Sequence, residues 1–480
     1  MTRTATANIL LEGPIIASLI KLAVPVVMAN VLQSAYGIID AFWVGRLGGA
    51  AVAAVSVSFP LIFLSISLGM GLAMAGSTLI AQYFGARNQE MVDHVAGQTL
   101  LMVALVSLAL GVIGFALAPL LLQLMGVGPD VYGGALGFMR VSFVGLVFNF
   151  FFFMFQSIMR GVGEATLPVW IVAGAVILNF IFDPLFIFGK FGLPAMGVMG
   201  AAAATLVTQM LAAIAALVIL LRGKYGIHLK WRNFGPDFGF IQRAFFLGLP
   251  ASIEMSARAL GLMMMTFLIT GFGTLAIAAY GVGSNVLQVV MIPAMGLSMA
   301  VATLAGQNIG AGNLARASEI GRLGALIGFA ALTAIGALVF AFAPALVAFF
   351  VPEDAGVIAA GGGFLRTISW AWGFLGLQLA LTGVLRASGA MVIAMVLTLV
   401  SQWVLQFPLA YVLSKHTPLG ISGLWWSLPI SQTVIALITL GVYARGDWKK
   451  TKLVDDEDRL SEKVSEEILS EEAFTGRGAT

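Results

Sequence analysis

The sequence predicts an all-α polytopic membrane protein, with twelve transmembrane helices in two six-helix lobes related by a pseudo-two-fold axis along the membrane normal. Three observations predict it: composition, the lengths of the apolar segments, and an internal repeat. Of the 480 residues, 60% are hydrophobic and only 10% are charged, whereas average proteins are roughly 25% charged. The chain has no cysteine, which excludes disulfides and thiolate chemistry.

Loop signals divide the apolar sequence into twelve segments, and most exceed the roughly 20 residues that span a bilayer. The first segment is too long for a cleaved signal peptide and lacks a small-residue cleavage site, so we expect it to remain as a membrane helix. The predicted helices are 15–44, 51–82, 92–118, 131–159, 166–188, 197–222, 240–270, 274–307, 316–343, 357–385, 391–413 and 420–444.

Lysine and arginine are distributed unequally between the two sides of these segments. With the N-terminus inside, the inner loops and flanks hold 16 of them and the outer loops and helix ends hold 5. This asymmetry predicts a multi-pass protein of the cell membrane with both termini cytoplasmic. The same loops account for the net charge of +3. The sequence has no basic arm or stripe of the kind that binds nucleic acid.

The two halves of the chain repeat each other. Residues 79–88, LIAQYFGARN, align with 304–313, LAGQNIGAGN, at a shift of 225, which also takes Pro25 to Pro250. Six helices per half give both halves the same orientation, so they should be related by an axis along the membrane normal, an arrangement found in transporters. We expect lobes at 1–222 and 240–445, joined by a cytoplasmic linker at 223–239 and followed by a disordered acidic cytoplasmic tail at 446–480.

Two aspartates lie within predicted spans of the first half. A charge at the bilayer centre costs about 2.5–3.5 kcal/mol on insertion scales, so such residues are usually functional. In the first helix Asn30, Gln33 and Asp40 fall on one stripe with Tyr36 beside it, and the helix also contains Pro25. Interhelical hydrogen bonding would explain the amides, but it fits carboxylates without a nearby cation poorly.

The second aspartate occurs in the fifth predicted helix. Asn179 and Asp183 are four residues apart and therefore share a helix face, with Pro184 next to them. We expect Asp183 to face Asp40, with Asn179 and Tyr36 as hydrogen-bond neighbours. Because two close carboxylates cannot both stay charged cheaply at low dielectric, the pair should take up a proton or hold a cation. We therefore interpret it as a coupling site in the N-terminal lobe.

The second half carries different residues at the corresponding places. Asp40 maps to Met265, within a methionine-rich stretch suited to varied apolar ligands. Ordinary gap-filling in helix packing explains such methionines somewhat better. As residues that line the substrate cavity we nevertheless expect Met265 and, from the first helix, Pro25, Asn30, Gln33 and Tyr36. Glu254 and Arg258, in the seventh helix near its inner end, are spaced i,i+4 and should form an ion pair. A structural role for that pair is at least as well supported as a functional one.

Taken together, these motifs resemble the multidrug and toxic compound extrusion (MATE) transporters. The resemblance covers 10–445 and rests on Pro25 followed by Asp40, on AQYFGARN, on RGVGEATLP (160–168) and on N-x3-D-P in the fifth helix. It implies two lobes that export amphipathic, mostly cationic compounds in exchange for H+ or Na+. The chain is most similar to the DinF-like and archaeal type.

The resemblance also implies roles for individual residues. In that type the coupling site lies in the N-terminal lobe, and its residues match Asp40, Asp183 and Asn179, with Tyr36 and Gln33 nearby. The same three residues would form a Na+ site. Some relatives add to this site a hydroxyl from the sixth predicted helix (197–222). That position matches Ala201 here, with Thr205 a turn away. Because a Na+ site needs several oxygen ligands, this favours H+ over Na+.

The sequence therefore predicts a cation-coupled antiporter, with H+ or Na+ as coupling ion and no cofactor. The alternative within the superfamily is a flippase of a lipid-linked precursor, which would need more basic residues in its cavity. No enzyme motif is present. The expected partners are small amphipathic cations and the lipid bilayer, with no nucleic acid, and we expect the chain to act as a monomer.

Overall fold

The computed structural model describes residues 10–192, 194–451 and 453–454, and within these ranges the chain forms helices and no strand. The helices of the first half are α2 (Ile15–Gly45), α3 (Gly49–Gly85), α4 (Gln89–Leu124), α5 (Pro129–Gly161), α6 (Thr166–Phe188) and α7 (Val198–Arg222). Those of the second half are α8 (Phe238–Thr270), α9 (Thr274–Gly310), α10 (Leu314–Phe350), α11 (Ala355–Ser369), α12 (Trp372–Ala387), α13 (Met391–Leu399), α14 (Phe407–Lys415) and α15 (Ile421–Arg445).

Eleven helices of the described chain are long and apolar enough to cross a membrane, when α13 and α14 are counted as the one continuous helix Met391–Lys415. There are twelve spans if α11 and α12, bent by 48°, also count as one. The predicted segments thus correspond to the observed helices. The bend within the tenth span was not predicted. Between α13 and α14, residues Val400–Gln406 form a π-helical turn. Pro408 lies two residues beyond the end of this turn. Because proline has no N–H, it cannot donate an α-helical hydrogen bond to the preceding turn.

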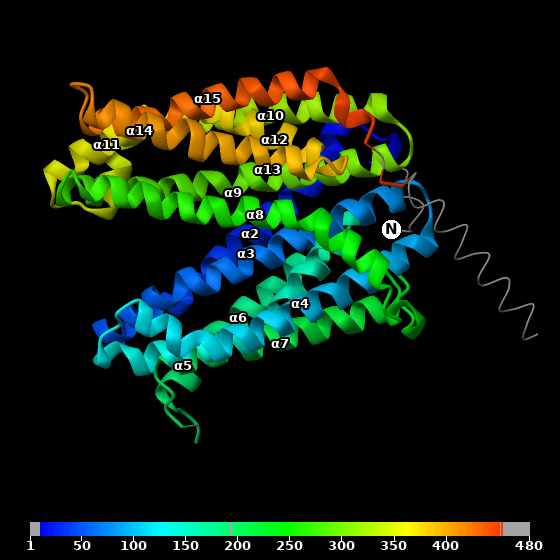
Figure 1. Cartoon of the computed structure of the whole chain (residues 1–480), viewed down its shortest axis with the longest axis horizontal. Coiled ribbons are helices and arrows are strands. Elements are labelled where there is room, and N and C mark those ends of the chain that lie inside the picture. The colour runs from blue at the N-terminus through cyan, green and yellow to red at the C-terminus, as the bar shows by residue number, and fades with distance from the viewer. Residues whose placement is uncertain (1–9, 193, 452, 455–480) are drawn as a thin grey trace, which may run out of the picture.

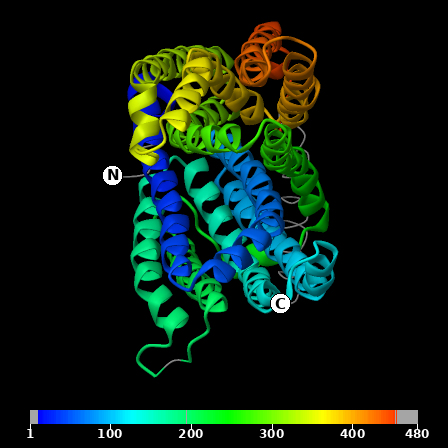
Figure 2. The ribbon, with the colours of Figure 1, turned by 90° about the vertical axis from the view of Figure 1, so that its left-hand side faces the viewer.

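The helices gather into two bundles (Figure 1). Helices α2–α7 form one bundle and α9–α15 the other, with α8 beside α3 where the bundles meet. The bundles lie together at the end near Gly85 and Gly310, called here the closed end. They diverge towards the opposite, open end. Figure 2, turned by 90°, shows the same two groups one above the other, with the connection between α6 and α7 protruding below.

At the closed end α3 and α9 approach one another almost backbone to backbone. A methyl group added at Gly85 would lie 1.9 Å from the Gln307 carbonyl oxygen, and one added at Gly310 would lie 1.9 Å from the Gln82 carbonyl oxygen. The Gln82 side chain donates a hydrogen bond to Ala387 O at 2.7 Å. Gln307 donates to the Gly161 carbonyl at 2.8 Å. At the repeat shift of 225 residues Gly85 corresponds to Gly310 and Gln82 to Gln307. The two halves therefore meet in a pseudo-symmetric manner.

Helix α2 contacts both bundles. Its first half contributes Leu19, Leu22 and Val26 to a buried cluster that also contains α9 residues such as Val301. Its second half packs against α6. Pro25 lies inside the helix between these two parts, and because proline leaves one backbone carbonyl without its helical partner it permits local bending. Helix α2 therefore links the interlobe contact to the N-terminal lobe.

The beginning of the predicted tail is folded, contrary to expectation. Residues 447–449 form a short 3-10 helix, and Trp448 is buried. Its ring stacks on Tyr443, and its indole nitrogen donates a hydrogen bond to the Tyr443 carbonyl at 3.1 Å. A buried aromatic contact is enough to order this segment. Residues 455–480, the acidic part of the tail, lie outside the described residues.

The glycine contact at the closed end can be tested by adding one methyl group. We expect Gly85→Ala to destabilise the protein by about 1–3 kcal/mol, because the new carbon overlaps the backbone of the other lobe. Gly174→Ala, at a position with no atom within 4 Å of the added carbon, should be neutral or slightly stabilising. The midpoint of thermal unfolding in detergent measures both. Equal midpoints for the two variants would contradict the tight interlobe contact.

Candidate functional site

The two predicted aspartates meet where α2, α6 and α7 converge. The Asp40 carboxyl group lies within hydrogen-bonding reach of the Asp183 carboxyl and of the Asn179 side chain. Asn179 donates to Asp183 Oδ1 at 3.2 Å from one helical turn away. Both α6 residues are fully buried, whereas Asp40 is half-buried. The local helical spacing places the amide beside the acid, and the packing of α2 on α6 brings the acids together.

A hydroxyl from α7 completes this group. Thr205 donates a hydrogen bond to Asp40 Oδ2 at 3.3 Å. The sequence placed Ala201 at the hydroxyl position of some relatives, with Thr205 one turn away. Ala201 is buried in a neighbouring cluster, and Thr205, one turn along the same face of α7, supplies the hydroxyl. The absence of a hydroxyl thus no longer counts against a Na+ site.

Several oxygen atoms of the site lack a hydrogen-bond donor. Asp40 Oδ1, Asp183 Oδ2 and Asn179 Oδ1 are buried and have no partner in the described structure. Buried polar atoms are nearly always satisfied in folded proteins. Three unpaired acceptors around two adjacent carboxyl groups are therefore suited to a proton or a small cation. These are the residues that would hold Na+, if Na+ is the coupling ion.

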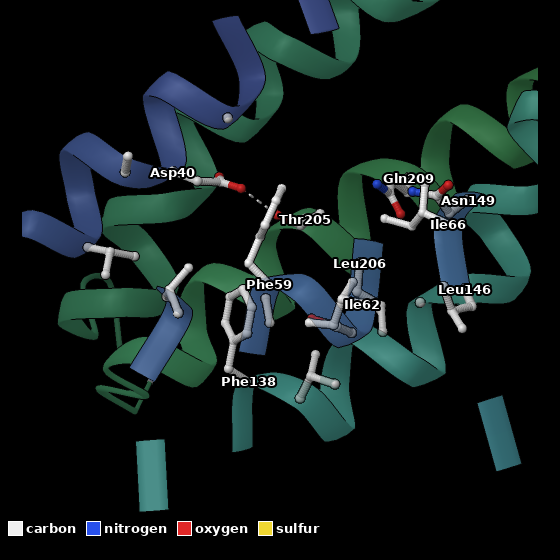
Figure 3. Close-up of a pocket in the computed structure, with 18 of the residues that line it drawn as sticks. Asp40, Phe59, Ile62, Ile66, Phe138, Leu146, Asn149, Thr205, Leu206 and Gln209 are labelled. Atoms are coloured by element: carbon white, nitrogen blue, oxygen red, sulfur yellow. Dashed lines mark hydrogen bonds between the residues drawn. The ribbon is translucent and has the colours of Figure 1, made fainter. Parts of the chain in front are cut away.

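Beside the acids lies a largely apolar cavity of about 370 Å³ within the N-terminal lobe. Figure 3 shows Asp40 hydrogen-bonded to Thr205 on one side, with Asn149 and Gln209 towards the other. Asp40 is the only ionisable residue among those that line it, and much of the wall is formed by residues such as Phe59, Ile62 and Leu206. Pockets for small organic ligands have this character: apolar walls with a few placed polar groups.

Gln33 and Tyr36 line a smaller cavity of about 200 Å³, which shares Gly37, Asn149 and Gln209 with the first. Tyr36 was expected to hydrogen-bond to the aspartates. It instead hydrogen-bonds to Thr208, whose own hydroxyl donates to backbone carbonyls, so Tyr36 is the donor. The different partner follows from the position of α7, which the sequence did not give.

Two residues of α2 that were expected to line the substrate cavity lie further along the helix from the aspartates. Asn30 and Pro25 are half-buried and line neither cavity. Sequence reasoning missed Asn149 and Gln209, which line both cavities. A signal was available for Gln209, because it shares a helical stripe with Thr205.

Met265 does not line a substrate cavity as expected. It is 1% exposed and belongs to the buried core of the C-terminal lobe. Its sulfur accepts a weak hydrogen bond from Gln406, at 3.9 Å. Met263 and Met264 are exposed instead. Helical periodicity places these neighbours on other faces, and only the packing of α8 against α13 and the π-helical segment Val400–Gln406 decided which of them points inward.

The predicted Glu254–Arg258 pair exists but has a third member. Arg258 Nη2 lies 3.0 Å from Glu254 Oε1, and Arg386 Nη2 lies 2.5 Å from the same oxygen. Thr398 donates to it as well, at 3.0 Å. Glu254 is fully buried in the middle of α8, not near its inner end as predicted. Arg386 comes from α12, so sequence spacing could not have revealed it.

The comparison with known proteins gives the family of the chain. The family model described as MatE matches residues 25–185 and 250–412, two stretches that begin at Pro25 and Pro250. The chain belongs to the MatE family. MatE proteins are transporters, so the chain is a multi-pass membrane transporter and not an enzyme.

The relatives are similar along nearly the whole chain. The probable multidrug resistance protein YoeA of Bacillus subtilis is 31% identical over 434 residues, which cover 90% of this chain and 93% of the relative. The probable multidrug resistance protein NorM of Thermotoga maritima is 28% identical over 444 residues, covering 92% and 94%. A solved outward-facing conformation of a multidrug resistance MATE family transporter shares the fold, with a TM-score of 0.85 at 24% identity over 92% of this chain and 98% of that one.

The arginine–glutamate cluster of this MatE protein gives a graded stability prediction. Glu254→Gln leaves two guanidinium groups without a counter-charge, and we expect a loss of about 3–5 kcal/mol. Arg258→Gln should cost less, because Arg386 and Thr398 still hold the carboxylate. The double variant Glu254→Gln with Arg258→Gln should not recover, since Arg386 stays uncompensated. Thermal unfolding and folded yield in detergent measure these effects.

The matched control is Glu90→Gln, which breaks an exposed pair with Arg232 and should change stability by at most about 1 kcal/mol. If Glu254→Gln were as stable as this control, the cluster would not be structural.

Proposed function

We propose that the protein is a cation-coupled antiporter that exports amphipathic cations by alternating access. The observation that carries this proposal is the Asp40–Asp183 pair, with its unpaired buried oxygens, of which Asp40 lines a largely apolar cavity. An apolar wall with a single negative group suits the apolar body and the positive charge of an amphipathic cation. The names of the relatives, probable multidrug resistance proteins, support the export of drugs.

Coupling follows from competition for the carboxylates. Two adjacent carboxyl groups without a cation between them repel unless at least one is protonated. A proton on Asp40 removes the charge that attracts a cationic substrate, and a bound cationic substrate disfavours the proton. Linkage makes this antagonism reciprocal, which an exchanger requires.

The direct approach of the two carboxyl groups favours H+ over Na+ as the coupling ion. A shared proton joins carboxyl oxygens at hydrogen-bonding distance, whereas Na+ would have to enter between them. The Thr205 hydroxyl and the Asn179 amide oxygen could nevertheless complete an oxygen shell around Na+, so the ion is decided by experiment. The complete site lies within one chain, and we propose that a monomer is sufficient for transport.

Alternating access requires the closed end to open while the other end closes. Helix α2 can transmit the change, because its second half carries Asp40 and its first half packs against α9 across the lobe contact. Repacking of α2 around Pro25 on protonation would alter that contact. We propose that the closed end, which carries most of the loop lysines and arginines, faces the cytoplasm and that the structure is outward-facing.

The coupling role predicts the behaviour of two conservative variants. Asp40→Asn and Asp183→Asn should both fold and insert, because asparagine keeps the shape and can hydrogen-bond, but both should lose gradient-driven export. The measurement is efflux of a cationic dye from proteoliposomes under an imposed pH gradient or, separately, an imposed Na+ gradient. An anionic dye of similar size should not be exported.

Asp130→Asn, which changes an exposed residue in the first turn of α5, is the control and should export at the unmodified rate. If both Asn variants still pump uphill as fast as this control, the aspartates only hold the helices together. If only the Na+ gradient drives export, the coupling ion is Na+ and not H+. Equal export of anionic dyes would refute the assigned substrate charge.

The orientation can be tested cleanly because the chain has no cysteine of its own. Single substitutions Lys190→Cys, in the connection between α6 and α7, and Lys224→Cys, in the linker after α7, place one thiol on each side. In intact cells a membrane-impermeant maleimide should label the first and not the second. Labelling of the linker cysteine alone would invert the topology and with it the outward-facing assignment.

A further inference from the structure

A third, smaller cavity lies between the two lobes near the closed end, with a volume of about 40 Å³. It is separate from the cavity beside Asp40 and is lined from both lobes. Arg160 lies in the last turn of α5 and Arg386 in the last turn of α12, at equivalent places of the repeat. Ser77 of α3 and Ser298 of α9 also line it.

The charge around this cavity is not balanced. Arg386 and Arg258 share Glu254 as their partner, and within the described ranges no acidic group lies within salt-bridge distance of Arg160. Three guanidinium groups and one carboxylate leave a formal charge of +2. The carbonyls at the end of α5 offset only a fraction of one charge. An uncompensated positive charge at a buried interface is strongly unfavourable.

Unpaired donors line this cavity, whereas the unpaired acceptor Glu254 Oε2 belongs to a residue outside its lining. The Arg386 Nε group is buried and lacks an acceptor, and no hydrogen bond of the described residues occupies the Arg160 side chain or the Ser77 hydroxyl. Ser298 is different, because its hydroxyl already donates to the Leu379 carbonyl at 2.6 Å. Free donors from both lobes thus line one small space whose net charge is positive. This is the reverse of the Asp40 site, where the unpaired atoms are acceptors.

We propose that this cavity binds one small inorganic anion, with Arg160, Arg386 and Ser77 as its donors. Guanidinium groups are well suited to such ligands. The volume of about 40 Å³ compares with about 10–15 Å³ that a single water needs on the same measure. It therefore admits an ion such as chloride or phosphate and excludes a drug-sized molecule.

The anion would act on the conformational equilibrium. Arg160 and Arg386 belong to different lobes, so both can contact one ion only while the closed end is closed. A ligand that binds one conformation better shifts the population towards it. The anion therefore favours the conformation seen here, and this inference does not depend on which cation drives export.

The test is anion binding to the full-length purified chain. Sodium gluconate is replaced stepwise by sodium chloride at constant ionic strength, and a second titration uses sodium phosphate. The readouts are the midpoint of thermal unfolding and equilibrium binding of radiolabelled chloride or phosphate. We expect a saturable rise in the midpoint and one class of site for at least one of the two anions, and which anion responds identifies the occupant.

Three variants make the result specific to the cavity. Arg160→Gln should abolish the saturable effect, and Ser77→Ala should raise the half-saturating concentration roughly tenfold by removing one hydrogen bond to a charged group. Arg222→Gln removes the same charge at an exposed position and should leave binding unchanged.

No saturable effect of either anion on the unmodified protein would overturn the proposal. Equal binding by the Arg160→Gln and Arg222→Gln variants would show an adventitious ion only. Should Arg160→Gln fail to fold, Ser77→Ala decides: an unchanged half-saturating concentration would exclude this cavity as the site.

Discussion

The close approach of α3 and α9 at the closed end is the contact on which the arrangement of the molecule depends. Gly85 and Gly310 leave room for the carbonyl oxygens of Gln307 and Gln82, and any side chain at these glycines would separate the helices. The glutamine side chains then hydrogen-bond to carbonyls of further helices. The lobes also meet along α2 with α9 and along α3 with α8, so the glycine contact is one part of a larger interface. The proposed alternation between two conformations requires this interface to open.

Helix α2 connects this contact to the aspartates. Its first half shares a buried cluster with α9, and Asp40 near its other end meets Asp183 of α6. In the proposed mechanism a change of charge at Asp40 alters what α2 packs against, and the same helix is part of the lobe contact. Helix α2 therefore offers a continuous physical path for the proposed coupling between ion binding and lobe movement.

The two halves share a scaffold but differ in charge. The N-terminal lobe holds two carboxyl groups with unpaired acceptors, and the C-terminal lobe places the thioether of Met265 and the amide of Gln406 in contact instead. Unbalanced positive charge gathers where the lobes meet, around Glu254 and three arginines. Each intramembrane charge of this kind is costly in a low-dielectric setting unless it is paired. In the two proposals, the unpaired ones are the groups through which ions change the conformation.

The sequence by itself determined the fold class, the bounds of most helices and the residue pairs within a helix. Apolar length sets the spans, and helical periodicity places Asn179 beside Asp183 and Glu254 beside Arg258. The repeat at a shift of 225 also predicted equivalent halves, as the reciprocal contacts of Gln82 and Gln307 show.

Only the tertiary structure decided which helices meet. Thr205 approaches Asp40 from α7, Arg386 reaches Glu254 from α12, and Tyr36 bonds to Thr208. Met265 turned out to be buried because of the helix packed against it. The helical periodicity of the sequence likewise did not predict the bend between α11 and α12. Helical periodicity fixes the direction of a side chain about its own axis, but the neighbour on that side is set by packing between segments far apart in the chain.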